Sequence, residues 1–189
     1  MHKTRKKLRK FIVIEGIDGV GKTTCARMLT EMMRGYYYKT PPPIFKSIRT
    51  EIDLAGDFVT RFLFYLTALS KSSVEIKKIL ERKNVLCDRF IYSTIAYHKA
   101  LGVDLSFIDF QKLPILSPDF TFYLWAREEV IRQRINNRAP KSISDEWLEK
   151  DRKLQAKIHK EFTSFPIHII DTSDLTPEEV CGKIIDTIG

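Results

Sequence analysis

The sequence lacks any apolar run long enough to cross a membrane, and it has few cysteines. A transmembrane helix needs about 20 consecutive apolar residues, and no such run occurs in the 189 residues. Cys25, Cys87 and Cys181 lie far apart and form no C-x-x-C pair, so we expect small buried thiols. The basic start of the chain is not followed by the apolar segment of a secretory signal. These absences exclude a membrane-spanning or disulfide-stabilised class and favour the reducing cytoplasm.

The positive charge is concentrated at the N-terminus. The chain has 32 Lys and Arg against 24 Asp and Glu, which gives a net charge of +8. Residues 1–10, MHKTRKKLRK, contain six of the basic residues and no acidic one. We therefore predict a solvated basic tail at 1–10 and a single, nearly neutral domain at 11–189. The alternative for the tail is an arm that contacts nucleic acid or another acidic partner, and nothing outside it predicts nucleic-acid binding.

Residues 11–24, FIVIEGIDGVGKTT, run from an apolar strand through a glycine-rich turn into a helix. Gly16, Gly21, Lys22 and Thr23 match the pattern G-x-x-x-x-G-K-[ST]. Glycines permit backbone conformations in which successive N–H groups surround a phosphate, and the following helix adds its positive dipole end. The lysine can reach the β- and γ-phosphates, and the threonine hydroxyl can ligate Mg²⁺. This stretch therefore predicts a phosphate-binding loop rather than an accidental glycine turn.

Apolar strands alternate with helical periodicity along the chain, which predicts a parallel sheet covered by helices on both faces. We expect an α/β fold with three layers, α/β/α, and five parallel strands at Phe11–Glu15, Tyr36–Lys39, Asn84–Cys87, Phe120–Trp125 and Ile167–Ile170. The expected helices are Lys22–Arg34, Ile44–Leu54, Phe58–Arg82, Ile91–Leu101, a short one after Gly102, Glu128–Asn137, Glu146–Phe162 and Pro177–Ile188. Ligands of such sheets bind at the carboxyl ends of the strands.

Charged residues follow two of these strands. Asp88 and Arg89 end an apolar strand. A carboxylate there suits the Mg²⁺ shell of a nucleoside triphosphate, and a guanidinium suits a phosphate; a helix-capping Asp beside a surface Arg is the alternative. Asp18 lies within the phosphate-binding loop, where it indicates a second, acceptor substrate, unless it only braces its own turn.

Arginines also share one face of the helix predicted after the fourth strand. Arg127, Arg134 and Arg138 lie on the same side as Ile131. They would stabilise the charge of a transferring phosphoryl group, or extend their stems over the core. The polar turn that follows them is suited to move as a short lid, which we place around residues 136–146. In the long helix, Phe62, Phe64 and Tyr65 are core candidates, and one of them could stack on a base.

Three segments together resemble the thymidylate kinase family of P-loop nucleoside monophosphate kinases. They are FIVIEGIDGVGKTT, CDRFIYSTIAYHKA at 87–100 and PDFTFYLWAREEVIRQRINNR at 118–138. The family's loop is typically F-I-x-x-E-G-x-D-G-x-G-K-[ST]-T, and its second motif is D-R-Y-x-x-S-x-x-A-Y, with Phe90 here in place of the first Tyr. The resemblance covers nearly the whole chain. It implies a P-loop kinase fold, ATP as phosphoryl donor, Mg²⁺ and a homodimer.

The resemblance also implies roles for individual residues. ATP would contact Gly16, Ile17, Asp18, Gly19, Val20, Gly21, Lys22, Thr23 and Thr24, with Mg²⁺ at Thr23 and Asp88. The acceptor nucleotide would contact Asp18, Arg49, Phe64, Arg89, Ser93 and Tyr97, with Phe64 stacked on the base. Catalysis would use Lys22, Asp18, Arg89, Arg134 and Arg138. The last two are included because Gly19 stands at a loop position where other members carry an arginine.

Two stretches depart from the family pattern. The family commonly has R-E-P-G after the second strand, whereas this chain has Lys39-Thr40-Pro41-Pro42-Pro43, which leaves Lys39 and Arg49 to supply positive charge. In the long helix the family has an Arg that recognises the thymine edge, and by spacing this position is Ala68. Both departures concern the acceptor base, while the residues expected to handle phosphate are retained.

The expected reaction is in-line transfer of the ATP γ-phosphoryl group to a deoxynucleoside monophosphate, most simply dTMP to dTDP. The acceptor phosphate is already anionic, so no general base is needed. The alternatives are another nucleoside monophosphate kinase, or a deoxynucleoside kinase with Asp88 or Glu15 as base for a neutral hydroxyl. From a different class, a non-catalytic nucleotide sensor or a nucleic-acid-binding protein that uses the basic tail is also considered.

Overall fold

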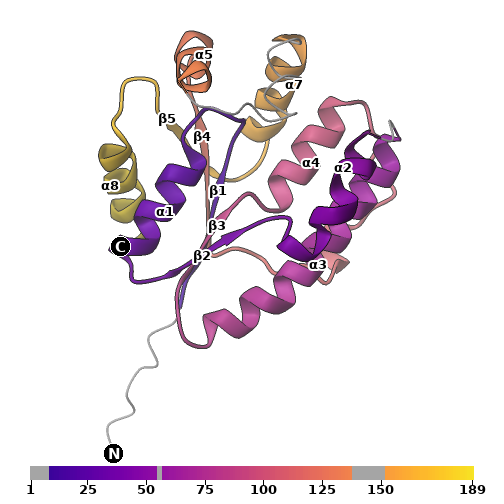
Figure 1. Cartoon of the computed structure of the whole chain (residues 1–189), viewed down its shortest axis with the longest axis horizontal. Coiled ribbons are helices and arrows are strands. Elements are labelled where there is room, and N and C mark those ends of the chain that lie inside the picture. The colour runs from indigo at the N-terminus through magenta and orange to yellow at the C-terminus, as the bar shows by residue number, and fades with distance from the viewer. Residues whose placement is uncertain (1–8, 55–56, 138–151) are drawn as a thin grey trace, which may run out of the picture.

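The computed structural model describes residues 9–54, 57–137 and 152–189. The lid expected around 136–146 lies almost entirely outside these residues, as do Arg138 and the start of the helix expected at 146–162. Most of the basic tail at 1–10 also lies outside them. Figure 1 shows the described chain as one α/β unit with its sheet in the middle.

Five parallel strands form one sheet in the order β2-β3-β1-β4-β5. They are β1 (Phe11–Glu15), β2 (Tyr36–Lys39), β3 (Val85–Asp88), β4 (Phe120–Trp125) and β5 (His168–Asp171). The expected five-stranded parallel sheet is confirmed. Two of the strands, β3 and β5, begin and end one residue later than predicted, which places Asp88 within β3.

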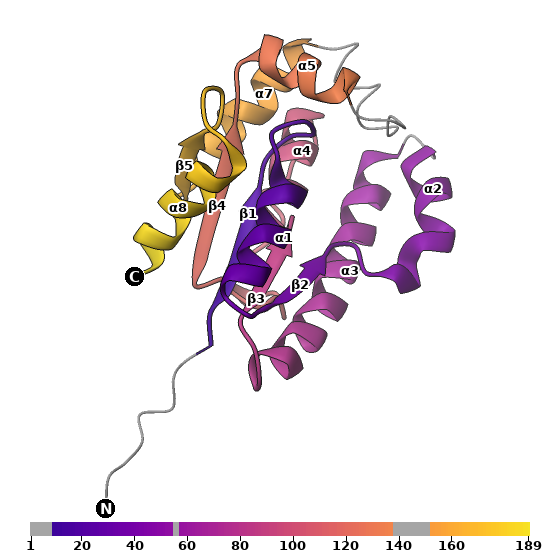
Figure 2. The same cartoon turned by 60° about the vertical axis from the view of Figure 1, so that its left-hand side comes forward.

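Helices cover both faces of the sheet. They are α1 (Lys22–Met32), α2 (Lys46–Leu54), α3 (Phe58–Leu80), α4 (Ile91–Ala100), α5 (Glu128–Asn136), α7 (Arg152–Thr163) and α8 (Pro177–Ile188). Figures 1 and 2 show α1 and α8 on one side of the sheet and α2, α3 and α4 on the other, with α5 and α7 near the end where β1 meets α1. The three-layer arrangement is therefore confirmed.

Alternating strand residues build a core on each face of the sheet. Ile12 and Ile14 of β1 belong to the larger apolar cluster, which includes α1 and α8 residues, while Phe11 and Val13 belong to the cluster beneath α3. This alternation follows from the two-residue period of a strand. Because both faces are covered, every residue of β1 is buried. This explains why a central parallel strand has a continuous apolar sequence.

Local differences from the predicted helices have simple causes. The segment expected to be helical from Ile44 begins as a short 3-10 turn, Pro43–Phe45, before α2, and short 3-10 turns are frequent at the start of an α-helix. The helix expected soon after Gly102 is only a 3-10 turn at Phe110–Lys112. At the other end of the chain, Thr176 and Glu179 form a reciprocal capping box that starts α8 at the predicted residue, Pro177.

The parallel arrangement brings the ends of several strands to one edge. Ile14 pairs with Asp88, Lys39 pairs with Asp88, and Glu15 pairs with Tyr123. The polar residues that end β1, β2 and β3 therefore meet beside the glycine-rich loop.

All three cysteines are free and buried. None of the helices within the described residues has the length and apolar character needed to span a membrane.

Candidate active site

The turn between β1 and α1 has a backbone that glycine alone accommodates at its tightest points. Gly16 has φ +144°, and a Cβ there would lie 2.4 Å from the Leu124 carbonyl oxygen. Gly19 has φ +86°, and a Cβ there would lie 3.0 Å from the side chain of Ile131. The first helix then begins at Lys22 with neither a side-chain cap nor an acidic residue in its first turn. Its N-terminal N–H groups and positive dipole end can therefore bind an anion.

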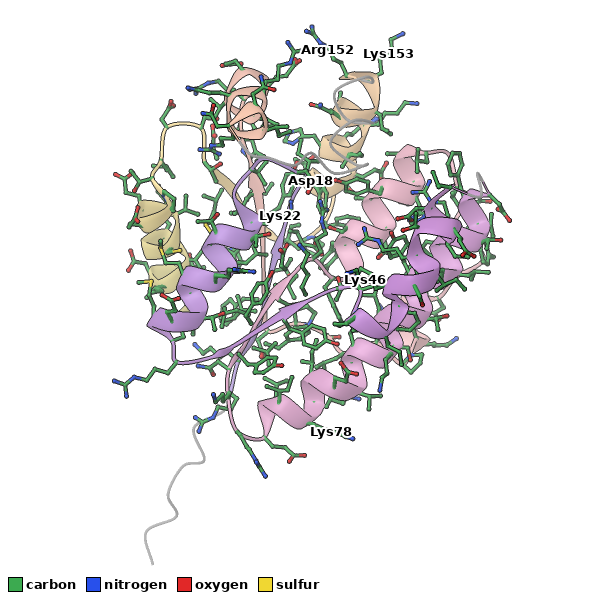
Figure 3. All side chains as sticks on the ribbon, viewed as in Figure 1. Asp18, Lys22, Lys46, Lys78, Arg152 and Lys153 are labelled. Atoms are coloured by element: carbon green, nitrogen blue, oxygen red, sulfur yellow. The ribbon has the colours of Figure 1, made fainter. Side chains whose placement is uncertain are left out.

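Lys22 lies inside this loop and is only 5% exposed. Its Nζ donates to the Ile17 carbonyl oxygen at 2.6 Å and lies 3.3 Å from an Asp18 carboxylate oxygen. Burial, assisted by the charge of Arg89, lowers the pKa of Lys22 to about 8. A bound phosphate would favour the ammonium form again. Figure 3 shows Lys22 and Asp18 near the middle of the molecule, whereas Lys78 lies at its periphery.

Asp88 meets Thr23 next to the loop and is itself 1% exposed. Its Oδ2 accepts hydrogen bonds from the hydroxyls of Thr23 at 2.5 Å and Tyr37 at 3.2 Å, and Lys39 Nζ lies at 3.5 Å. Its Oδ1 is buried and has no hydrogen-bond partner within the described residues. Burial opposes ionisation, but the charge of Lys22 and the Thr23 bond outweigh it, so the pKa of Asp88 is lowered. An ionised carboxylate beside a hydroxyl suits a hard divalent cation.

Arg89 has an unusual backbone conformation, with φ +69°. Left-handed geometry costs a non-glycine residue about 1 kcal/mol or more. Two hydrogen bonds fix it here: its N–H donates to the Ile14 carbonyl oxygen at 3.0 Å, and its own carbonyl oxygen accepts from Thr40 Oγ1 at 2.9 Å. Strain of this kind that the surroundings enforce is typical of functional sites.

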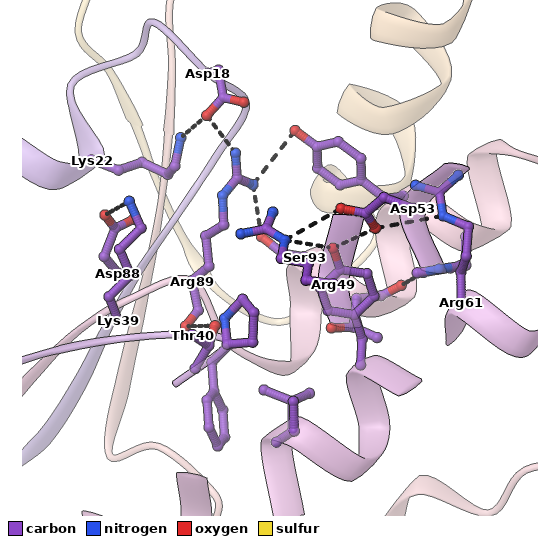
Figure 4. A pocket seen from close by; sticks show the side chains of 18 of the residues that line it. Asp18, Lys22, Lys39, Thr40, Arg49, Asp53, Arg61, Asp88, Arg89 and Ser93 are labelled. Atoms are coloured by element: carbon purple, nitrogen blue, oxygen red, sulfur yellow. Dashed lines mark hydrogen bonds and ion pairs between the residues drawn. The ribbon is translucent and has the colours of Figure 1, made fainter. Parts of the chain in front are cut away.

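The guanidinium of Arg89 links the loop to α4. Nη2 lies 2.7 Å from Asp18 Oδ1, and Nη1 donates to the Gly16 carbonyl oxygen at 2.9 Å. The same Nη1 lies 3.3 Å from Ser93 Oγ and 3.5 Å from the Tyr97 hydroxyl. Four residues expected at the acceptor site, Asp18, Arg89, Ser93 and Tyr97, are thus brought together by one network, which Figure 4 shows in part.

Glu15 is fully buried and accepts hydrogen bonds from residues at the start of α4. Its Oε1 accepts from the backbone N–H groups of Phe90 at 3.0 Å and Ser93 at 3.1 Å, and its Oε2 accepts from the Ser93 hydroxyl. Phe90, the N-cap residue, makes no side-chain cap of its own. Burial raises the pKa of Glu15. Because both oxygens bind the helix start, and Glu15 is not among the residues that line the cavities, the geometry gives it no access to an acceptor hydroxyl.

Two cavities meet at the phosphate-binding loop. The first, about 570 Å³ in volume, extends from the loop towards α2, α3 and α4. The second, about 600 Å³, extends from the loop towards α5 and the start of α8. Asp18, Lys22, Thr23 and Lys39 line both. The same four side chains would therefore contact ligands bound on either side of the loop.

The far end of the first cavity has its own cluster of polar residues, and Figure 4 shows Asp53 and Arg61 across the cavity from Lys22 and Asp88. Asp53 accepts a hydrogen bond from the Tyr65 hydroxyl at 2.8 Å, and its carboxylate lies 3.3 Å from Arg49 Nε and 3.8 Å from Arg61 Nε. The sequence identified Arg49 here but gave no sign of Asp53 or Arg61, because helices α2 and α3 must first pack together.

Phe64, which was expected to stack on the acceptor base, is not among the residues that line the first cavity. Its ring packs edge-on against Phe45 and Tyr65, with ring centroids 5.6 Å and 5.3 Å away. The aromatic residue of α3 that lines the cavity is Tyr65, one position further along, together with Ala68. The resemblance to the family placed the base-stacking aromatic at Phe64, but the rotation of α3 against α2 decides which ring faces the cavity.

The arginines expected on one face of α5 have different neighbours. Arg134 lines the second cavity, and its guanidinium donates to Thr172 Oγ1 at 3.0 Å and to the Thr172 carbonyl oxygen at 2.8 Å. Arg127 instead forms a two-pronged surface ion pair with Asp174. Arg138 lies outside the described residues. Of the three, only Arg134 is therefore placed beside the loop by the structure.

Comparisons with known proteins agree with this geometry. A family model described as "Thymidylate kinase" matches residues 14–184. The chain belongs to the thymidylate kinase family. Among curated relatives, a probable thymidylate kinase of Methanocaldococcus jannaschii is 34% identical over 182 residues, with 93% of each chain covered. Another, from Thermococcus kodakarensis, is 31% identical over 203 residues, which cover 94% of this chain and 96% of that protein. The family predicted from the three sequence segments is confirmed, and with it ATP as the phosphoryl donor.

Solved thymidylate kinases share the fold. The enzyme of Candida albicans aligns with a TM-score of 0.75 at 23% identity, over 95% of this chain and 91% of that one. A deoxyadenosine kinase from M. mycoides aligns with a TM-score of 0.65 at 18% identity, over 94% of this chain and 98% of that one. The fold is thus common to thymidylate kinases and a nucleoside kinase, and only the residues of the site can separate the two activities.

Proposed function

We propose that this thymidylate kinase family member transfers the γ-phosphoryl group of ATP to dTMP, giving ADP and dTDP. The observation that supports this most is the pair of cavities that share Asp18, Lys22, Thr23 and Lys39. A donor and an acceptor bound on the two sides would have their phosphates in contact with the same loop. Holding both reactants in line, together with electrostatic stabilisation, accounts for most of the catalysis of this reaction.

Residues of the loop and α4 are assigned to different phosphates. Backbone N–H groups from Gly16 to Thr24, together with the ammonium group of Lys22, would bind the ATP phosphates. Arg89 would bind the acceptor phosphate, and Asp18 would hold its guanidinium in place through the 2.7 Å contact. Arg134 would neutralise charge on the transferred group from the second cavity, with Arg138 as the further candidate.

Thr23 and Asp88 are the residues that would hold Mg²⁺. The buried Asp88 Oδ1 without a partner and the adjacent Thr23 hydroxyl fit a cation that prefers oxygen ligands. The described residues contain no group of three or more His, Cys, Asp or Glu side chains suited to a metal, so nucleotide phosphates and water would complete the shell. The ion would supply positive charge next to the phosphates.

No general base is needed for this reaction, because the attacking oxygen belongs to an anionic phosphate. A nucleoside kinase would need a carboxylate at a neutral hydroxyl. Glu15 is committed to the start of α4, and Asp88 is assigned with Thr23 to Mg²⁺. The side-chain geometry therefore favours a monophosphate acceptor over a nucleoside.

The direct test is ADP release measured with ATP, Mg²⁺ and each natural deoxynucleoside monophosphate, with the matching nucleosides in parallel. We expect turnover with dTMP and none with thymidine. Lys22→Ala should abolish transfer without unfolding the protein, whereas the exposed-lysine control Lys83→Ala should behave as wild type. Turnover of nucleosides only, or full activity of Lys22→Ala, would contradict the proposal.

Three further expectations concern the whole protein. A homodimer is inferred from the family resemblance, and light scattering after size-exclusion chromatography would test it. A cytoplasmic location is inferred from the few, widely separated cysteines. The basic tail at 1–10 is expected to be dispensable for phosphoryl transfer. Salt-sensitive binding to nucleic acid that disappears when these residues are removed would instead make the tail a nucleic-acid contact.

A further inference from the structure

A buried histidine lines the acceptor cavity at the end far from the loop. His98 of α4 is 4% exposed and belongs to the cavity wall. Its Nδ1 lies 2.7 Å from the Thr94 carbonyl oxygen. A carbonyl oxygen can only accept a hydrogen bond, so Nδ1 must carry the proton. In a neutral ring this makes Nε2 an acceptor.

The ring is neutral at physiological pH. Burial, with a further contribution from the charge of Arg61, lowers the pKa of His98 to about 4, although the Thr94 bond and Asp53 act in the opposite direction. Its orientation is fixed by neighbouring rings, with the Phe62 centroid at 5.3 Å and the Tyr65 centroid at 6.0 Å. The side chain is thus rigid and has a single protonation state.

Nε2 of His98 is buried and has no hydrogen-bond partner within the part of the chain that the structure describes. Buried polar atoms nearly always have a partner, and a ligand is a ready explanation for one that lacks it in a cavity wall. The guanidinium groups of Arg49 and Arg61 also lie at this end, with the carboxylate of Asp53 and the hydroxyl of Tyr65. Asp53 already accepts from Tyr65 and lies against both guanidinium groups, so His98 Nε2 is the acceptor here that has no partner among the described residues.

This pattern matches one pyrimidine edge and not the other. Thymine presents a donor, N3–H, next to an acceptor, O4, whereas cytosine presents an acceptor, N3, next to an amino donor. An unpartnered acceptor in a cavity wall that also carries guanidinium donors complements the thymine edge and leaves groups unpaired against cytosine. Ala68, on the same wall, offers only a methyl group.

We propose that His98 Nε2 selects the acceptor base by accepting the hydrogen bond of its ring N3–H, with Arg49 or Arg61 donating to O4. This rests on the proposed function, because it assumes a nucleoside monophosphate in the first cavity. His98 would then be a specificity-determining residue, and the guanidinium that donates to O4 would take the place of the arginine missing at Ala68.

The test compares dTMP with N3-methyl-dTMP, which lacks the N3–H donor, in wild type, His98→Phe and His98→Gln. We expect kcat/KM for dTMP to fall about tenfold in His98→Phe, the value of one neutral hydrogen bond, while that for N3-methyl-dTMP changes less than twofold. The glutamine variant, which still offers an acceptor oxygen, should retain most of the dTMP value. An equal loss with both nucleotides in His98→Phe, or a wild-type preference for dCMP over dTMP, would overturn the proposal.

A second measurement does not depend on variants or turnover. The imidazole ¹⁵N resonances of wild type are followed as dTMP or N3-methyl-dTMP is added. A shift of the unprotonated Nε2 resonance with dTMP alone would support the hydrogen bond, and bound dTMP without such a shift would overturn it. Absence of turnover with every monophosphate would instead contradict the proposed function, so the two failures are distinguishable.

Discussion

The two ends of the acceptor cavity are built in different ways. The phosphate end is formed by two short segments that lie side by side because β1 pairs with β3. The first contains six consecutive loop residues followed by Lys22 and Thr23, and the second contains Asp88 and Arg89. At the base end, Arg49, Asp53, Tyr65 and His98 come from three helices, α2, α3 and α4. Figure 4 shows labelled residues of both ends in one view.

The difference shows why one end has a sequence motif and the other does not. Phosphate is bound by backbone N–H groups whose geometry a local pattern of glycines fixes. A base edge is bound by side chains whose mutual positions depend on how separate helices pack. The absence at Ala68 of the arginine that the resemblance leads us to expect can then be compensated by side chains of another helix, and such a change leaves no recognisable spacing in the sequence. The following predictions test this contrast, from the largest expected effect to the smallest.

Removing the Arg89 side chain should have the largest effect, because it acts on a charged phosphate. We expect Arg89→Ala to lower kcat/KM for dTMP about 10²–10³-fold, the usual cost of one such contact. Arg89→Gly should lose the same activity but be more stable than Arg89→Ala by about 1 kcal/mol, since glycine relieves the left-handed φ. Activity restored by glycine would mean that the backbone, not the guanidinium, matters at this position.

At the base end, His98 should make the fold sensitive to acid. Its pKa is about 4 in the folded protein against 6.5 for an ordinary histidine. The unfolded chain therefore binds more protons between these values, and stability falls as the pH decreases from about 6.5 towards 4. The loss reaches about 3 kcal/mol. The free energy of unfolding, measured with urea at pH 7 and pH 4.5, should depend less on pH in His98→Gln than in wild type. The exposed control His168→Gln should show the same pH dependence as wild type. Equal behaviour of both variants would contradict the burial of a neutral imidazole.

The phosphate end should respond at alkaline pH instead. Lys22 has a pKa of about 8 in the free protein, so above pH 8 an increasing fraction lacks the positive charge that binds ATP phosphates. We expect kcat/KM for MgATP to fall about tenfold per pH unit above this value. A profile that stays flat to pH 10 would show that Lys22 keeps its proton there.

The smallest effect is expected from Tyr65→Phe. It removes the hydroxyl that donates to Asp53 at 2.8 Å and accepts from Arg49 at 3.2 Å. We expect a loss of about 1 kcal/mol in stability, the value of one hydrogen bond, and a few-fold increase in KM for dTMP with kcat unchanged. Tyr36→Phe, at a tyrosine that is 45% exposed on β2, is the matched control. A larger fall in kcat than rise in KM would place Tyr65 at the reacting phosphates instead.

Much of the fold and of the phosphate end was predictable from sequence. The strands, the helices that alternate with them and the phosphate-binding loop follow from local apolar patterns and glycine spacing. Asp18 and Arg89, 71 positions apart, were both identified, and the 2.7 Å contact between them follows once β1 and β3 are neighbours. The resemblance assigned Phe64 rather than Tyr65 to the base, and the sequence could not correct this because it does not fix the rotation of a helix against its neighbour. The lid at 136–146 and Arg138 stay predictions.

By itself, the sequence determined the phosphate chemistry of this protein, because glycine conformations, a loop lysine and a strand-ending Asp-Arg pair are local properties. Only the tertiary structure decided the rest. It placed Glu15 at the start of α4 and left His98 Nε2 as a buried acceptor without a partner among the described residues, in a cavity wall that also contains Arg49 and Arg61. The physical reason is that burial and hydrogen-bond partners, which set the protonation state and role of a side chain, arise from packing between distant segments.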